Sequence, residues 1–470
     1  MVFSSNLFLY GFMPIFFSLY YLISDRHRNW LILLASLIFY SIGAGSTVLV
    51  LLVSIWVNQF LAVRIEPAPP VRRKALLATG VAANLLALGY YKYGAFLWQL
   101  GAAAGGILGF HAPAETLSIP LPIGISFFTF QAISYLIDVY RKEISSAGSY
   151  GEFATYHSLF PQLIAGPIVR YREIKLEMRR RSIDGAMLTE GAYRFCLGLG
   201  KKTVIADNIG AVVDKTFALP TAQLDAGHAW LGIFCYSLQI YFDFSGYSDM
   251  AIGLGRLLGF HFPENFDQPY RSANITEFWR RWHMTLSRWF RDYVYISLGG
   301  NRKGRLRTFF NLWIVFFLCG LWHGAGLTFI AWGLYHGLLL IVERFVATEW
   351  HWRPSGALGV AMCFVLVTIG WVFFRSPSLS AAGHYLAAMF FLAPATPGVL
   401  AIKSELTPEI ECYLLLGVFF AFAPLDRVSA LRFDRPVVMT SQLGLAGVSL
   451  VYSSVLLAAN SFNPFIYFRF

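Results

Sequence analysis

Two histidines in one long apolar segment could act as bases that accept a proton at membrane depth. Residues 308–342 form a run of 35 positions without an acidic or basic residue, apart from the titratable imidazoles of His323 and His336. An ionisable group at membrane depth is costly and usually faces a cavity or a partner. A neutral imidazole is the natural base near pH 7 for taking a proton from a hydroxyl. His323 is therefore the candidate catalytic base.

This charge-free run is too long to be one straight membrane helix. At about 1.5 Å per residue it would extend for about 52 Å, whereas a bilayer core is about 30 Å thick. The sequence Leu321-Trp322-His323-Gly324-Ala325-Gly326 contains the residues at which bending is easiest, Gly324 and Gly326. We therefore expect a break directly after His323, and irregular backbone at such depth lines a cavity or is buried in protein.

A third histidine lies in the segment from Asn274 to Ser297. Wound as one helix at about 100° per residue, this segment gathers Trp279, Trp282 and further apolar residues in one arc and its arginines in the opposite arc. His283 falls at the edge of the aromatic arc. The pattern predicts an amphipathic helix at the membrane surface, with His283 either a packing residue or a second functional imidazole.

Other chemistries have weaker support in the sequence. We find no HExxH pattern, no GxSxG elbow and no P-loop, which argues against a zinc protease, a serine hydrolase and an ATPase. The five cysteines have no CxxC spacing, so we expect neither a disulfide framework nor a metal site. His336 lies 13 positions after His323, or about 220° around a straight helix, and is expected to be structural and to face elsewhere.

The composition is that of an integral membrane protein. Of 470 residues 57% are hydrophobic and 13% are charged, against about 25% charged in soluble chains. The basic residues behind the net charge of +11 lie between apolar runs, so we expect anionic lipids and anionic substrates as their partners, and no nucleic acid. The fold class is all-α and polytopic, with about ten to thirteen membrane-embedded helices.

Alternating loop charges orient the first spans. Basic loops near residues 25–28, 64–74 and 141–142 alternate with nearly uncharged ones, which by the positive-inside rule predicts an N-terminus outside and basic loops in the cytoplasm. The expected apolar segments are near residues 6–23, 30–42, 47–63, 75–91, 119–139, 229–242, 358–374, 413–423 and 443–459.

Three further segments carry less certain roles. Residues 160–167 are apolar but too short to cross, and are expected to be re-entrant or interfacial. Residues 170–181 are rich in basic residues, and anchor the chain on anionic lipid or dock an acidic donor. Asp243 and Asp249 lie beside an apolar segment, where carboxylates need partners, so structural pairing is favoured over a channel role.

Several motifs together resemble one known family, the membrane-bound O-acyltransferases, and in particular their bacterial branch that O-acetylates alginate. The resemblance covers essentially the whole chain. The residues that carry it are Met1 to Asn6, Tyr241 to Gly253, Asn265 to Tyr270, Phe278 to His283, Leu298 to Arg302, Leu321 to Ala325 and Asn463 to Phe470.

The resemblance implies a fold and a division of roles. It implies a single membrane domain over residues 1–470, a ring-like helical body around a central tunnel, with N-terminal spans in 1–145, the catalytic core in 146–345 and C-terminal spans in 346–470. His323 would be catalytic and His283 would support it. The residues expected to bind the donor or line the tunnel are Trp279, Trp282, Trp322, Asp243, Ser245 and Asn274.

The function implied is transfer of an acetyl group across the bacterial inner membrane to an exopolysaccharide such as alginate. No bound cofactor is expected; acetyl-CoA from the cytoplasm would be the acyl donor, and a periplasmic acetyltransferase or esterase-like protein would be the partner. Two alternatives remain. One is D-alanyl transfer to teichoic acid from an acyl carrier protein, and the other is a proton-coupled transporter, which the lack of an internal repeat disfavours.

Overall fold

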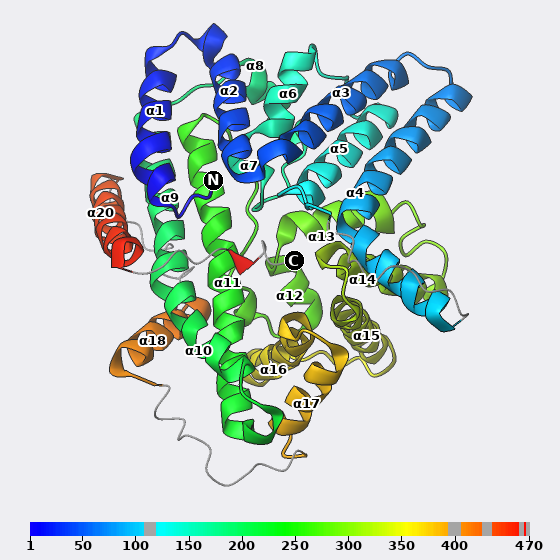
Figure 1. The fold of residues 1–470 in the computed structure, drawn as a ribbon, viewed down its shortest axis with the longest axis vertical. Helices are drawn as coiled ribbons and strands as arrows, with labels where there is room; N and C mark the ends of the chain where they lie inside the picture. The colour runs from blue at the N-terminus through cyan, green and yellow to red at the C-terminus, as the bar shows by residue number, and fades with distance from the viewer. Residues whose placement is uncertain (108–118, 393–405, 425–434, 460–464, 467–470) are drawn as a thin grey trace. The chain divides into compact units, whose positions relative to one another are not determined.

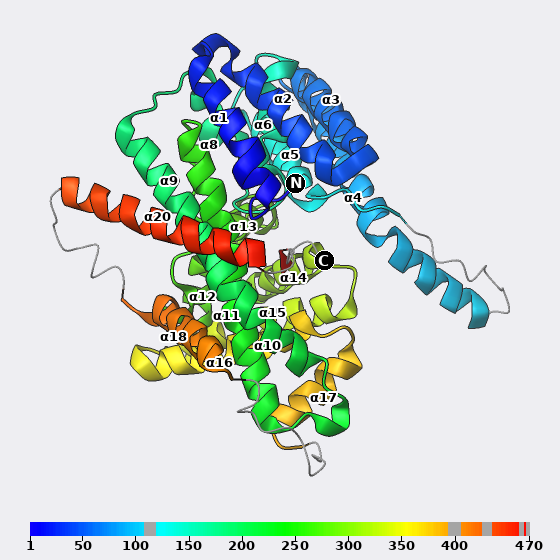
Figure 2. The same cartoon turned by 60° about the vertical axis from the view of Figure 1, so that its left-hand side comes forward.

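The computed structural model describes residues 1–107, 119–392, 406–424, 435–459 and 465–466 (Figures 1 and 2). Every regular element in these residues is a helix, which confirms the all-α class. Most of the motif 463–470 lies outside the described residues. The chain divides into two compact units: unit 1 is Met1–Ile183 with Gly255–Phe262, and unit 2 is Asp184–Leu254 with Pro263–Phe470.

Unit 1 consists of the N-terminal helices. They are η1 (Leu7–Phe12), α1 (Met13–Leu22), α2 (Asp25–Ala44), η2 (Gly45–Thr47), α3 (Val48–Ile65), α4 (Pro70–Ile107), α5 (Ile125–Tyr140), α6 (Tyr150–Ser158), α7 (Phe160–Leu163) and α8 (Tyr171–Arg179). Helices α3, α4 and α5 pack side by side (Figure 1). A buried hydrogen bond joins α5 to α3, because the Tyr135 hydroxyl donates to Gln59 Oε1 at 2.7 Å.

Unit 2 contains most of the 32-residue helix α11 and the site discussed below. Its elements are α9 (Gly185–Gly200), η3 (Lys201–Ala206), α10 (Asp207–Phe217), η4 (Thr221–Gln223), α11 (Ala226–Leu257, whose last three residues belong to unit 1), η5 (Pro269–Arg271), α12 (Ile275–Arg281), α13 (Met284–Phe290), η6 (Arg291–Tyr295), α14 (Arg305–His323), α15 (Leu327–Glu349), α16 (Gly356–Arg375), α17 (Leu379–Met389), α18 (Pro408–Phe422) and α20 (Arg435–Ala459).

The expected apolar segments correspond to helices, with differences in length. Helix α4 is longer than the expected segment 75–91, and α11 continues through the acidic stretch that follows residue 242. Five segments are long and apolar enough to cross a membrane: Asp25–Ile65, Arg305–His323, Leu327–Glu349, Gly356–Arg375 and Val437–Ala459. Two shorter apolar helices, Leu7–Leu22 and Ile125–Tyr140, accompany them in the described residues.

Helix α11 can continue because its carboxylates are paired inside unit 2. Asp243 accepts from Lys202 Nζ at 2.6 Å and from the Ile466 backbone N–H at 2.9 Å. Asp249 is bridged by Lys201 at 2.6 Å and Arg194 at 2.7 Å. A buried charge is tolerated when it is paired and hydrogen-bonded. The predicted structural pairing of both acids is confirmed.

Candidate active site

The chain breaks directly after His323, as the length of the charge-free run predicts. Helix α14 ends at His323, Gly324 is extended (φ −171°, ψ 163°), and α15 begins at Leu327. A Cβ on Gly324 would lie 2.3 Å from a ring carbon of Phe329. Only glycine leaves room for the aromatic ring here, so the turn brings α15 back against α14.

Two glycines hold the α14–α15 hairpin in close contact. A Cβ on Gly320 would lie 2.4 Å from the Phe329 carbonyl oxygen, and one on Gly333 would lie 2.3 Å from the Phe316 carbonyl oxygen. The two backbones therefore touch without intervening side chains, which is the way that small residues allow membrane helices to approach. His323 is the last residue of this hairpin's first helix, and the contact fixes its position.

The His323 ring is buried among aromatic rings contributed by three helices. Its side chain is 6% exposed. The ring centroid lies 4.8 Å from Trp322, 5.0 Å from Trp332 on α15 and 5.1 Å from Phe374 on α16, each with its plane steeply inclined to the imidazole. Such edge-to-face contacts orient a ring as well as bury it.

The expected single helix over Asn274–Ser297 is wrong, because the chain breaks at Trp282 and His283. Helix α12 ends at Arg281 and α13 begins at Met284, while His283 has left-handed backbone angles (φ 42°, ψ 55°). A non-glycine residue in this region is uncommon, costs free energy and is found mainly where surrounding contacts over-determine it. The break turns His283 inward, where its side chain is 1% exposed.

Asn265 supplies those contacts. Its side-chain oxygen accepts from the Thr285 backbone N–H at 3.3 Å and from the Thr285 hydroxyl at 2.8 Å, and its amide nitrogen donates to the Ser248 hydroxyl at 3.0 Å. The same oxygen lies 3.0 Å from His283 Nδ1. A backbone N–H can only donate, so the atom facing Thr285 is the carbonyl oxygen, and His283 Nδ1 must be the donor. Asn265 therefore fixes the tautomer of His283.

This tautomer leaves His283 Nε2 with a free lone pair. Nε2 is buried, and within the described residues nothing hydrogen-bonds to it. Burial lowers the pKa of His283 to about 3, so the imidazole is neutral at pH 7. The Trp322 ring lies between the two candidate histidines, with its centroid 6.0 Å from His283 and 4.8 Å from His323. One indole thus joins both imidazoles in a single buried cluster.

The expectation that His336 faces away from this cluster is wrong. The rings of His336 and His323 both contact Trp332, with centroid distances of 5.1 Å and 5.0 Å. His336 also packs 5.1 Å from Trp279. The angle of about 220° between the two histidines holds only for a straight helix. The break at Gly324 reverses the chain direction, so both histidines contact the same ring. Whether His336 is purely structural remains a prediction.

The other predicted site residues fall into two groups. Trp279, Trp282 and Trp322 are buried in or beside the aromatic cluster, and the Trp279 indole N–H has no hydrogen-bond partner in the described residues. Asp243 is engaged with Lys202 as described above. Asn274 caps α12, because its side-chain oxygen accepts from the Glu277 N–H at 2.9 Å, and Ser245 is buried on α11.

A cavity of about 310 Å³ adjoins the cluster in unit 2. Its inner wall includes Trp279 and Phe316, together with Cys319, which lies one helical turn before His323. Its lining also includes three arginines, Arg280, Arg291 and Arg344, whose side chains are exposed. An apolar interior with a basic rim suits a ligand that has an anionic part and an uncharged part.

Sequence reasoning missed Asn265, Trp332, Arg344 and the cavity itself. Asn265 belongs to a motif that carries the family resemblance, but its role depends on a contact with His283, 18 residues later. Trp332 and Arg344 come near the site only through the hairpin. Within the described ranges no three His, Cys, Asp or Glu side chains gather as a metal ion would require.

Comparisons with known proteins identify the family of the chain. The sequence model described as "MBOAT, membrane-bound O-acyltransferase family" matches residues 125–351, a range that includes His283, His323 and His336. The probable alginate O-acetylase AlgI of Pseudomonas putida is 41% identical over 502 aligned residues, covering 100% of both chains. The chain belongs to the membrane-bound O-acyltransferase family.

Other members of the membrane-bound O-acyltransferase family are similar to smaller parts of the chain. The peptidoglycan O-acetyltransferase of Helicobacter pylori is 38% identical over 433 residues, 83% of this chain and 80% of that protein. The teichoic acid D-alanyltransferase of Bacillus subtilis is 29% identical over 281 residues, 56% of this chain and 70% of that protein. The chain is therefore an acyltransferase with several membrane spans.

Proposed function

We propose that this acyltransferase is an O-acetyltransferase of the bacterial inner membrane, which takes acetyl groups from acetyl-CoA in the cytoplasm and passes them outward for O-acetylation of an exopolysaccharide such as alginate. The observation that carries the proposal is the cavity with the basic rim, whose inner wall ends at Trp279 and Cys319 beside the buried histidine cluster. The names of the O-acetylating relatives support the same choice of acyl group and acceptor class.

The arrangement suits a donor such as acetyl-CoA. Arg280, Arg291 and Arg344 would bind its phosphates, since guanidinium groups bind phosphate oxygens through charge-assisted hydrogen bonds. The pantetheine arm and thioester would occupy the apolar interior. The basic rim would also concentrate an anionic substrate at the mouth of the cavity.

His323 would act as the general base. In the transfer, the acceptor hydroxyl oxygen forms a bond to the thioester carbonyl carbon while its proton passes to the His323 imidazole; the C–S bond then breaks, and the leaving thiolate takes up the proton. His283 would orient or activate the acceptor through its free Nε2. The indole N–H groups of Trp279 and Trp332, which have no partner in the described residues, would stabilise the developing oxyanion.

The same proposal has three further parts. They are a tunnel between the two membrane faces, a periplasmic N-terminus, and a periplasmic acetyltransferase or esterase-like partner. They rest on the family resemblance and on the alternating charges of the loops. Donation from an acyl carrier protein, as a teichoic acid D-alanyltransferase would require, is the competing assignment, and the lower identity and coverage of that relative disfavour it.

The test is donor turnover by the purified protein in lipid nanodiscs. Acetyl-[¹⁴C]CoA is supplied with an alginate oligosaccharide and the membrane-free periplasmic extract of the same bacterium, and release of the CoA thiol and labelled glycan are both measured. His323→Ala should reduce turnover by at least about 10³-fold, the size of a general-base contribution. The matched control is His384→Ala, at an exposed histidine on α17, which should turn over normally.

Two results would contradict the proposal. Near-normal turnover by folded His323→Ala would remove His323 from the chemistry. If the glycan were labelled from a D-alanyl carrier protein and not from acetyl-CoA, the donor would be the carrier protein and not acetyl-CoA. A double change, Arg280→Ala with Arg344→Ala, should raise KM for acetyl-CoA about tenfold or more, about 1.4 kcal/mol, whereas Arg353→Ala, at an exposed arginine outside the cavity, should leave KM unchanged.

A further inference from the structure

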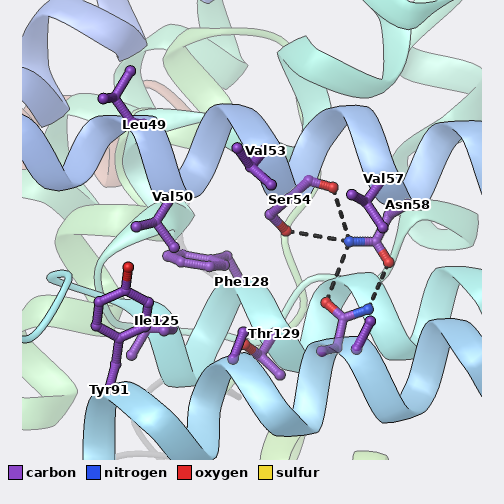
Figure 3. Close-up of a pocket in the computed structure, with 13 residues that line it drawn as sticks. Leu49, Val50, Val53, Ser54, Val57, Asn58, Tyr91, Ile125, Phe128 and Thr129 are labelled. Carbon is purple, nitrogen blue, oxygen red and sulfur yellow. Dashed lines mark hydrogen bonds between the residues drawn. The ribbon is translucent and has the colours of Figure 1, made fainter.

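A second cavity, of about 400 Å³, lies in unit 1 among α3, α4 and α5 (Figure 3). Its walls are mainly apolar and include Val50, Val53 and Val57 of α3, Ala87 of α4 and Phe128 of α5. None of the proposed chemistry uses it. A volume of this size is that of a ligand site rather than of a packing defect.

The polar side chains at one end of this groove satisfy one another. Asn58 and Asn84 exchange hydrogen bonds at 2.7 and 3.2 Å, and Asn58 also donates to the Ser54 carbonyl oxygen at 2.8 Å (Figure 3). Asn84 donates to the Gly80 carbonyl oxygen at 2.8 Å, and the Ser54 hydroxyl lies 3.1 Å from His157 Nε2. These groups close the groove and have little left to offer a polar ligand, so the ligand must be mainly hydrocarbon.

The groove is open to the surroundings of α3. Leu49 and Val53 both line it, yet they are 61% and 59% exposed. Helix α3 is part of the membrane-crossing candidate Asp25–Ile65, so what surrounds these side chains is lipid. An apolar groove that opens to hydrocarbon is filled by hydrocarbon, because no water is available there and an empty groove forfeits dispersion contacts.

The length of the groove matches one leaflet. From Leu49, in the first turn of α3, to Asn58 is nine residues, or about 14 Å of helix, and half of a bilayer core is about 15 Å. Because the uncharged turn η2 separates two apolar helices, we expect it to lie at the membrane surface, which would put Leu49 near that surface and the amide pair near mid-depth. At the outer end, the side chain of Tyr91 points toward the α3 wall (Figure 3). A tyrosine hydroxyl is typical of the interface, where lipid ester groups lie.

We propose that this groove binds one acyl chain of a membrane phospholipid, which enters from the leaflet at the Gly45–Thr47 turn, runs along α3 and ends at the Asn58–Asn84 pair. The bound chain completes the packing of α3, α4 and α5. The site is independent of the proposed acetyl transfer, since every residue that lines it belongs to unit 1 and the histidine cluster belongs to unit 2.

The experiment follows one phospholipid through purification. The full chain is reconstituted in phosphatidylethanolamine and phosphatidylglycerol vesicles doped with a phospholipid that carries a diazirine on one acyl chain, and is then exchanged into detergent by gel filtration. We expect about one retained phospholipid per chain by native mass spectrometry. After illumination, peptides containing Val50, Val53 or Ala87 should carry the label, whereas peptides containing the exposed Val451 of α20, outside the groove, should lose it with the bulk lipid.

Two matched substitutions on α4 distinguish phospholipid binding in the groove from a general effect of a larger side chain on lipid retention. Ala87→Leu adds a side chain into the groove and should reduce the retained phospholipid at least fivefold. Ala82→Leu makes the same change at an exposed position of α4 outside the groove and should retain it. The proposal fails if wild-type protein retains no phospholipid, or if both variants retain the same amount. The labelling of wild-type protein decides the matter even if Ala87→Leu does not fold.

Discussion

Replacing Asn265 tests the role of His283, because the Asn265 side-chain oxygen accepts a hydrogen bond from His283 Nδ1. Asn265 is fully buried, and its oxygen serves three donors, at 2.8, 3.0 and 3.3 Å. Asn265→Ala removes the hydrogen bond to Nδ1, whose net contribution is about 1–1.5 kcal/mol. Losing it removes about a tenfold preference for the tautomer with Nε2 free, and it also frees the ring to rotate.

We therefore expect Asn265→Ala to lower kcat for acetyl transfer by about 10- to 100-fold, the range seen when a partner that orients a histidine is removed, while KM for acetyl-CoA changes little. The variant also leaves buried donors unpaired, at about 1–3 kcal/mol each, so the folded fraction must be measured by gel filtration and thermal melting. Asn208→Ala, at a partly buried asparagine on α10, is the matched control and should keep full activity.

Asn265→Asp keeps the acceptor and adds a carboxylate beside His283. The pKa of His283, which burial holds at about 3, should rise, because a neighbouring negative charge favours the imidazolium. Activity should therefore fall at a higher pH on acidification than in the wild type. The reasoning is refuted if Asn265→Ala causes the same further loss in a His283→Ala background as in the wild type, since Asn265 would then act independently of His283.

Three further predictions concern stability. Gly320→Val should destabilise the α14–α15 hairpin by several kcal/mol, because its Cβ would lie 2.4 Å from the Phe329 carbonyl oxygen, and the melting temperature in nanodiscs measures this. Burial lowers the pKa of His157 to about 3, so between about pH 6.5 and pH 3 the unfolded chain binds a proton at this histidine that the folded chain does not. The melting temperature should therefore fall as the pH drops from about 6.5 toward 3. The fall should be smaller in His157→Gln. Lys202→Met should cost about 3–5 kcal/mol by leaving Asp243 buried and unpaired, and a second change, Asp243→Asn, should recover much of the loss in urea unfolding.

The break after His323 could be predicted because it follows from length alone. A charge-free run longer than the bilayer core must bend, and glycine marks where. The break at His283 could not, because its sequence has a continuous amphipathic pattern and no glycine. The left-handed backbone there is imposed by Asn265, 18 residues earlier, through hydrogen bonds that no local pattern encodes. Local propensity is a weak prior where tertiary contacts over-determine a residue.

For the buried acids as well, one property could be predicted from the sequence and another could not. Physical chemistry requires that Asp243 and Asp249 have partners, and this requirement was predicted correctly. The identity of the pairing cations depends on how η3 and α9 pack on α11. Lys202 pairs with Asp243, and Lys201 and Arg194 pair with Asp249. The position of His336 was predicted wrongly for a related reason: helical angles hold only within one helix, and the chain reverses at Gly324 before reaching it.

The glycine contact between α14 and α15 gives the two imidazoles unequal freedom. His323 ends a hairpin whose two backbones are in direct contact, and this contact restrains its position. His283 joins two helices of seven residues each, and its left-handed backbone stores about 1–3 kcal/mol that a rearrangement would release. Gating motions that admit an acceptor are therefore expected around His283, visible as faster amide hydrogen exchange in α12 and α13 than in the last two turns of α14.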